Sequence, residues 1–152
     1  MAIEIERKFL VTGDGFRNAP GVRFSQGYLS HTPERTVRVR IAAEQAFLTI
    51  KGATHGATRL EFEYPIPLAD AQALLALCGA GVIDKVRHTL VYQGKTWEVD
   101  VFAGANQGLV VAEIELQSED ESFAKPEWLG EEVTHDPRYY NANLSTSPYA
   151  HW

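Results

Sequence analysis

Polar and apolar residues alternate along most of the first 117 residues of this chain. The stretch RTVRVRIA (35–42) shows the pattern most simply, because Arg38 and Arg40 fall on one face of a strand and Val37 and Val39 on the other. The same period of two predicts strands at 3–11, 22–30, 46–52, 58–66, 82–92, 95–102 and 109–117. The pattern therefore indicates about eight strands.

The period changes in one segment and again in the tail. Residues 67–78 are rich in Ala and Leu, their apolar positions fill a helical stripe, and Gly79 is placed to end a helix. In the tail, SFAKPEWLGEEV (122–133) and DPRYYNANLS (136–145) predict short helices. Successive strands with short connections favour an antiparallel sheet, and this many strands favour closure. We predict a single domain (1–152) of the mainly β (α+β) class: an eight-stranded antiparallel β-barrel with a helix between the fifth and sixth strands and a short helical C-terminal tail.

Composition narrows the class of protein. No apolar run approaches the roughly 18 residues of a membrane span, and the N-terminus lacks the apolar stretch of a signal peptide. The single cysteine, Cys78, excludes an intramolecular disulfide. We therefore expect a cytoplasmic protein without a membrane partner. The net charge of −6 argues against a nucleic-acid partner, although a local basic pocket stays compatible with it.

The polar faces of the strands carry charges that are segregated by sign. RVR (38–40) and KVR (85–87) are basic, whereas EFE (61–63), EVD (98–100) and EIE (113–115) are acidic. The simplest interpretation is the salt-bridged exterior of an ordinary barrel. The segregation, the abundance of arginine and the need to cover the apolar faces favour instead a polar lumen. There a polyanion would compensate the bases and divalent cations the acids.

The first charged strand resembles a known signature. EIERK (4–8) is similar to the ExExK motif of the CYTH superfamily, the triphosphate tunnel metalloenzymes, and the basic and acidic motifs above follow it in the family's order. The resemblance covers residues 3–117, continues into the tail, and is greatest to the short bacterial members. It implies an antiparallel tunnel whose lumen binds a triphosphate with one or two divalent metal ions, Mg²⁺ or Mn²⁺.

The resemblance also implies roles for individual residues. The metal-side ligands would be Glu4, Glu6, Asp100, Glu113 and Glu115. The triphosphate would be held by Lys8, Arg38, Arg40, Lys51, Lys85 and Arg87. Glu61 and Glu63 would orient the bases or contribute to a second metal. Lys85 and Tyr28 would be the catalytic pair for proton transfer. Arg59 and Glu98 have the parity of lumen residues but lie near strand ends, so their place stays open.

These features predict metal-dependent hydrolysis of a small-molecule triphosphate, with inorganic tripolyphosphate cleaved to pyrophosphate and phosphate. A class IV adenylyl cyclase, which would convert ATP to cyclic AMP, is an alternative with the same tunnel. A nucleoside or thiamine triphosphatase is another, and a polyphosphate-binding module is the non-enzymatic one. The sequence also leaves open whether the protein forms a homodimer.

Overall fold

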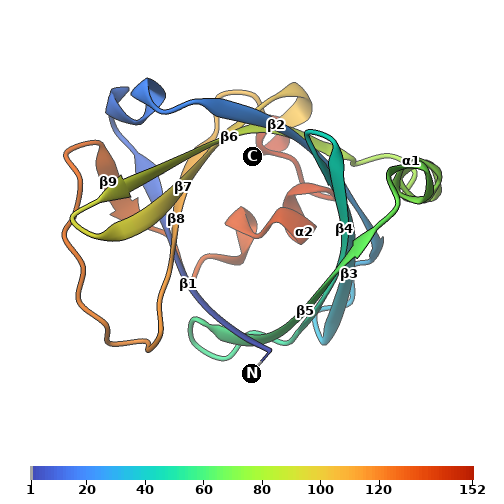
Figure 1. Ribbon diagram of the computed structural model, residues 1–152, viewed down its shortest axis with the longest axis horizontal. Coiled ribbons are helices and arrows are strands. Elements are labelled where there is room, and N and C mark those ends of the chain that lie inside the picture. Colours follow the sequence, from blue (N-terminus) through green and yellow to red (C-terminus); the bar gives the residue numbers. More distant parts are fainter. Residues whose placement is uncertain (1) are drawn as a thin grey trace.

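The computed structural model describes residues 2–152, and its centre is a closed ring of β-strands (Figure 1). The wall consists of β1 (Ile3–Val11), β2 (Gly21–Ser30), β3 (Arg35–Ala42), β4 (Gln45–Gly52), β5 (Thr58–Ile66), β6 (Ile83–Tyr92), β7 (Lys95–Phe102) and β8 (Val110–Glu115). The order is β5-β4-β3-β2-β6-β7-β8-β1, and an antiparallel pairing of β1 with β5 closes the ring. The predicted eight-stranded antiparallel barrel is confirmed.

Helices lie outside the wall and at its end. The helix α1 (Leu68–Leu77) follows β5, as predicted, and packs outside the ring. Gly79 comes just after it with φ +68, a conformation that glycine adopts without strain. The tail carries the predicted short helix α2 (Asn141–Leu144), which Figure 1 shows within the outline of the ring. Single 3₁₀ turns are η1 (Gly15–Asn18), η2 (Gly104–Asn106), η3 (Pro137–Tyr139) and η4 (Tyr149–His151).

The helix predicted within 122–133 is wrong. This segment is irregular up to residue 128 and then forms a ninth strand, β9 (Leu129–Glu132), which pairs with β1. The physical reason is the edge that β1 leaves open. Because β5 pairs only with Ile3–Ile5, the second half of β1 has unpaired backbone groups, and β9 binds them through Phe9 and Val11.

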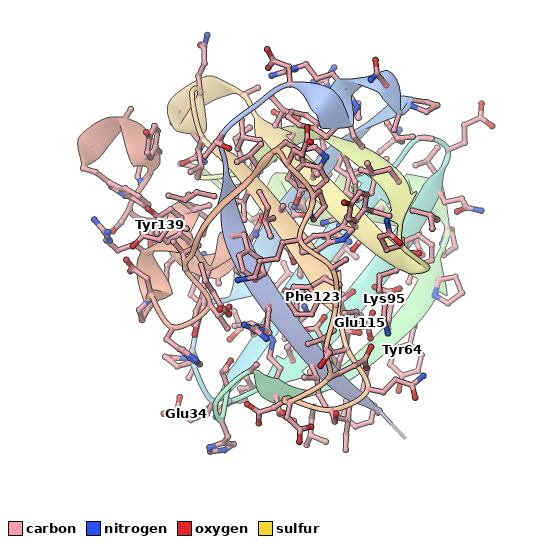
Figure 2. The ribbon with its side chains drawn as sticks, turned by 90° about the vertical axis from the view of Figure 1, so that its left-hand side faces the viewer. Glu34, Tyr64, Lys95, Glu115, Phe123 and Tyr139 are labelled. Carbon is pink, nitrogen blue, oxygen red and sulfur yellow. The ribbon has the colours of Figure 1, made fainter. Side chains whose placement is uncertain are left out.

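The outer face of the barrel is apolar, and much of it is covered by other segments of the chain. η1 and the segment after β8, which includes Phe123 (Figure 2), cover one part of the wall. The buried residues of this cluster are Phe9, Phe16, Trp97, Val99, Ala112, Ile114, Leu116 and Trp128. The helix α1 covers a second part over Val39 and Ala46. The charges consequently face inward: Lys85 is 1% exposed and Arg38 7%, so the interpretation as a salt-bridged exterior is wrong.

The C-terminal segment closes one end of the barrel. Tyr139 and Leu144 belong to a buried cluster with Tyr28, Phe102 and Val111 from the wall. Figure 2, seen at right angles to the view of Figure 1, shows Tyr139 with this segment at one end of the molecule. Among residues 2–152, no helix combines the length and the apolar character needed to cross a membrane.

Candidate active site

A cavity of about 550 Å³ occupies the lumen of the barrel. Its walls include every predicted site residue except Asp100: Glu4, Glu6, Lys8, Tyr28, Arg38, Arg40, Lys51, Glu61, Glu63, Lys85, Arg87, Glu113 and Glu115. Arg59 and Glu98, whose place the sequence left open, also line it. Asp100 is 0% exposed and lies behind Lys85 and Arg87. Charged motifs that alternate along separate strands thus lie together around one cavity.

Four cations from β3 and β6 form one wall of the cavity, here called the basic cluster: Arg38, Arg40, Lys85 and Arg87. The guanidinium groups of Arg40 and Arg87 lie over the ring of Phe24, at 4.8 and 4.9 Å from its centroid. Arg40 Nε donates to Gln26 Oε1 at 2.8 Å, and within residues 2–152 no carboxylate forms an ion pair with Arg40. Burial, Arg38 and Arg87 lower the pKa of Arg40 to about 9. The basic cluster therefore carries uncompensated positive charge.

Asp100 is the anion behind this cluster. Its Oδ2 accepts from Lys85 Nζ at 2.7 Å, while Arg87 donates to Oδ1 at 2.7 Å and to Oδ2 at 2.9 Å. Burial opposes ionisation of Asp100, but Arg87 and Lys85 outweigh it and hold its pKa at about 2. Burial lowers the pKa of Lys85 to about 7, because Arg87 and Arg40 add repulsion that the attraction of Asp100 only partly offsets. Lys85 can therefore exchange a proton near neutral pH.

Carboxylates from β1, β7 and β8 gather on another wall as the acidic cluster: Glu6, Glu98, Glu113 and Glu115. The strand register sets Glu6 opposite Glu115 and Glu98 opposite Glu113, so like charges face each other. Burial and neighbouring carboxylates raise the pKa of Glu115, and they raise that of Glu98 despite Arg87. Lys8 Nζ lies 3.1 Å from Glu6 and 3.2 Å from Glu113, and their attraction raises its pKa although burial opposes this. Glu115 lies away from the end that Tyr139 occupies (Figure 2).

A third group joins β1, β4 and β5. Glu4 accepts from Lys51 Nζ at 3.1 Å and from Arg59 Nε at 3.2 Å, and Glu61 lies 3.2 Å from the same Lys51 nitrogen. Glu63 accepts from the Thr49 hydroxyl at 3.0 Å, and that hydroxyl in turn accepts from Arg38 Nη2. Each of these three carboxylates thus contacts a cation of the cavity, directly or through one hydroxyl.

Tyr28 lies beside the basic cluster. It is 8% exposed and faces Arg38 in the register between β2 and β3. Its ring stacks on His31, with centroids 5.6 Å apart, and both residues line the cavity. The cavity is also lined by four residues to which the sequence analysis assigns no role: His31, Tyr140, Asn141 and Asn143. No motif marks these residues, because their place depends on how the tail packs.

Known proteins resemble this chain over nearly its whole length. The model of the CYTH domain matches residues 2–144. The chain belongs to the CYTH family. It is 49% identical to an inorganic triphosphatase of Acetivibrio thermocellus over 98% of this chain and 97% of that one. It is 38% identical to an inorganic triphosphatase of Nitrosomonas europaea over 95% of this chain and 97% of that one.

Solved structures of other proteins have a similar fold. An inorganic triphosphatase structure is 36% identical to this chain, with a TM-score of 0.68 over 95% of each chain. A protein of Pyrococcus horikoshii OT3 is 20% identical, with a TM-score of 0.60 over 77% of this chain and 80% of that one. The second likeness shows the fold alone. The fold is thus shared at low sequence identity.

Membership in the CYTH family implies a divalent metal ion, and the donor set fits a hard cation. Among residues 2–152, no three His, Cys, Asp or Glu side chains already form a cage for a metal. A full cage is not required, because Mg²⁺ commonly binds one or two carboxylates together with water and substrate phosphates. The opposed pairs Glu6–Glu115 and Glu98–Glu113 supply oxygen ligands whose mutual repulsion a cation would relieve.

Proposed function

We propose that this CYTH protein hydrolyses inorganic tripolyphosphate to pyrophosphate and phosphate in its tunnel, with Mg²⁺ or Mn²⁺. The observation that carries the proposal is the surplus positive charge at Arg40, which lies half-buried beside Arg38 and Arg87 without an ion pair to a carboxylate of residues 2–152. A half-buried cation that is crowded by two others favours an anionic partner, and guanidinium groups match phosphate oxygens in geometry. The relatives at 49% and 38% identity are both named inorganic triphosphatases.

The proposal divides the lining residues into two sets. The triphosphate would be bound by Lys8, Arg38, Arg40, Lys51, Lys85 and Arg87. The metal-side carboxylates would be Glu4, Glu6, Asp100, Glu113 and Glu115. Asp100 would reach a metal only by loosening Lys85 or Arg87, which makes its ligand role the most demanding of the five. Glu61 and Glu63 would orient Lys51 and Arg38, or contribute to a second metal, and the first role agrees with their contacts.

A bound divalent ion would neutralise phosphate charge and favour formation of the nucleophile. The protein's own part is to align the chain of phosphates and to move one proton. Water attacks the terminal phosphorus, the bond from that phosphorus to the bridging oxygen breaks, and pyrophosphate leaves with the bonding electron pair. The proton of the water passes to neutral Lys85, directly or through the Tyr28 hydroxyl, while the basic cluster stabilises the charge on the leaving group.

The test is phosphate release from tripolyphosphate and from ATP, with and without Mg²⁺ or Mn²⁺, with the products resolved by ion chromatography. We expect metal-dependent formation of pyrophosphate and phosphate, lost in Glu4→Ala and in Arg40→Ala. The matched control is Arg23→Ala, because the Arg23 side chain is 76% exposed and pairs with Asp84 outside the lumen. Cyclic AMP from ATP would identify a cyclase instead, and tight binding without turnover would identify a binding module.

The oligomeric state stays a prediction. Leu60 and Tyr64 on β5 are 52% and 53% exposed, and Phe62 between them is 40% exposed. Such apolar side chains on a sheet are typical of contact surfaces, and a homodimer would cover them. Sedimentation analysis of the wild type and of Tyr64→Glu tests this, since the charged variant is expected to be monomeric.

A further inference from the structure

The C-terminal segment reaches into the cavity at the position of Lys85. Asn141, the first residue of α2, lines the lumen together with Lys85. Its Oδ1 accepts from Lys85 Nζ at 3.1 Å and from Gln26 Nε2 at 3.0 Å. Figure 1 shows α2 within the ring, so this side chain comes from an element that is not part of the barrel wall.

The orientation of this amide is fixed by its partners. Gln26 is 0% exposed, and its Oε1 accepts from Arg40 Nε at 2.8 Å. The amide nitrogen of Gln26 must therefore face Asn141. Because Gln26 and Lys85 both donate to Asn141, the side chain of Asn141 must present its oxygen, and not its nitrogen, to them. A relay of side chains thus runs from Arg40 through Gln26 and Asn141 to Lys85, and it links two members of the basic cluster.

Two fixed acceptors determine the direction of the Lys85 nitrogen. Asp100 Oδ2 lies 2.7 Å from Nζ on the wall side, and Asn141 Oδ1 lies 3.1 Å from it on the side of the tail. Besides its bond to carbon, the lysine nitrogen can form three hydrogen bonds. The ammonium group donates all three, and the neutral amine donates two and accepts one through its lone pair. With two directed at Asp100 and Asn141, the remaining one is available to the substrate or to Tyr28.

The same segment also supports Tyr28. His31 stacks on the Tyr28 ring, and His31 Nε2 lies 2.9 Å from Ser145 Oγ, directly after α2. The Ser145 hydroxyl in turn donates to the carbonyl of Ala142. Residues 141–145 therefore contact Lys85 directly and Tyr28 through one intervening ring.

We infer that residues 141–145 are a positioning element for the Lys85–Tyr28 pair and that Asn141 is its positioning residue, acting through the oxygen that it presents to Lys85. The inference rests on the proposed function, since it assigns Asn141 a part in triphosphate hydrolysis. A loss of alignment at a reacting group costs about 10- to 100-fold in turnover. A residue that only filled the end of the tunnel would have no such effect.

Two substitutions separate positioning from space-filling. Asn141→Leu keeps the size of the side chain and removes the acceptor, whereas Asn141→Asp keeps an acceptor oxygen in the same place. We expect Asn141→Leu to lower kcat for tripolyphosphate by about 10- to 100-fold with KM little changed. Because the new carboxylate favours the ammonium form of Lys85, Asn141→Asp should shift the rise of kcat to higher pH. At a pH above that rise it should keep kcat within about threefold of the wild type, while its added negative charge raises KM for a polyanion.

The matched control is Thr146→Ala, whose exposed hydroxyl donates only to the Asn143 carbonyl in the same segment. It should leave kcat, KM and the melting temperature unchanged. Circular dichroism and kcat are recorded well below the melting temperature of every variant, so that a destabilised variant is still compared in its folded form.

Three outcomes would overturn the inference. If the wild type turns over and Asn141→Leu keeps its full kcat, the positioning role alone is refuted. Equal losses of kcat in the Leu and Asp variants, compared at a pH above the rise of each, would refute it as well. Absence of turnover in the wild type would instead refute the proposed function, and the positioning role with it. The two failures are therefore distinguishable.

Discussion

Asp100 Oδ2 lies 2.7 Å from Lys85 Nζ, and neither side chain is exposed. Arg87 donates to both oxygens of the same carboxylate, so one anion compensates two cations behind the surface of the cavity. Removal of a single partner from a buried ion pair leaves uncompensated charge, which is far more costly than loss of an exposed pair. Asp100 thus contributes both to the stability of the barrel and to the position of the two cations that face the cavity.

We expect Asp100→Asn to lower the free energy of unfolding by about 3–5 kcal/mol, measured by urea denaturation at neutral pH. The control is Asp14→Asn, because the Asp14 side chain is 89% exposed and pairs only with Arg17 one turn away. It should cost well under about 1 kcal/mol. Equal effects of the two substitutions would mean that the buried pair contributes no more than a surface one.

The pH dependence of this difference has a defined sign. The pKa of Asp100 is lowered from 3.8 to about 2 in the folded protein, so its contribution is complete above 3.8. It is lost as the pH falls from there towards 2. The difference in the free energy of unfolding between the wild type and Asp100→Asn should therefore become smaller as the pH falls over this range. A constant difference would contradict the lowered pKa of Asp100.

The proposed role of Lys85 predicts a rise of kcat/KM with pH. The pKa of Lys85 is about 7 in the protein without substrate, and a proton acceptor is active only above its pKa. Bound phosphate favours the ammonium form, so the corresponding rise in kcat should lie at higher pH. Lys85→Arg should abolish the rise, and Tyr28→Phe should lower kcat.

Lys95→Ala is the control for this profile, since Lys95 pairs with Glu121 outside the cavity. It should reproduce the wild-type curve. A flat wild-type profile around pH 7, or a rise that persists in Lys85→Arg, would remove Lys85 from the proton transfer.

Glu115→Gln should separate stability from activity. Glu115 faces Glu6 across β1 and β8, so its removal relieves a repulsion of up to about 1 kcal/mol in the metal-free protein. The same change removes a proposed metal ligand. We expect a higher melting temperature without metal, together with a higher Mg²⁺ or Mn²⁺ concentration for half-maximal activity. Glu127→Gln, at an exposed position outside the cavity, should change neither quantity, and a destabilised Glu115→Gln would contradict the repulsion.

Gly81→Ala should disturb the C-terminal segment from outside the cavity. Gly81 has φ +90, and a Cβ there would stand 2.2 Å from the carbonyl oxygen of Ser145. Gly94 has a similar φ of +77 with nothing within 4 Å of its Cβ position, so Gly94→Ala measures the backbone strain alone, about 1–2 kcal/mol. We expect Gly81→Ala to lower the melting temperature further and to lower turnover. Equal melting temperatures in the two variants would show that Ser145 gives way at no cost.

The alternation of residues was sufficient to predict which charges meet. Arg38 and Arg40 share a face by parity alone, as do Glu113 and Glu115, and both pairs line the cavity. This succeeded because a strand has only two faces and the apolar one must be covered. The alternation does not predict how deeply a side chain is buried. Asp100 has the parity of a lumen residue but lies beneath two cations, whereas Glu98, in the middle of β7, lines the cavity.

The tail could not be predicted in the same way. The segment 122–133 has helix-forming residues, yet an open edge of β1 more than a hundred positions earlier makes part of it a strand. Asn141 is an ordinary polar residue in its own neighbourhood, and only the tertiary fold brings it to Lys85. Contacts between distant segments override local propensity in both cases.

The sharing of β1 between several partners has a consequence for how the protein folds. The strands β2, β3, β4 and β5 pair in succession, and β6 with β7, so hairpins can form as soon as they are synthesised. β1 needs β8 and β9 as well as β5, and its Arg7 meets Glu132 across 125 positions of the chain. Such distant pairing is slow to form. β1 precedes the other barrel strands in the sequence but is therefore expected to close the ring last, and catalytic activity should appear only with the slowest phase of refolding.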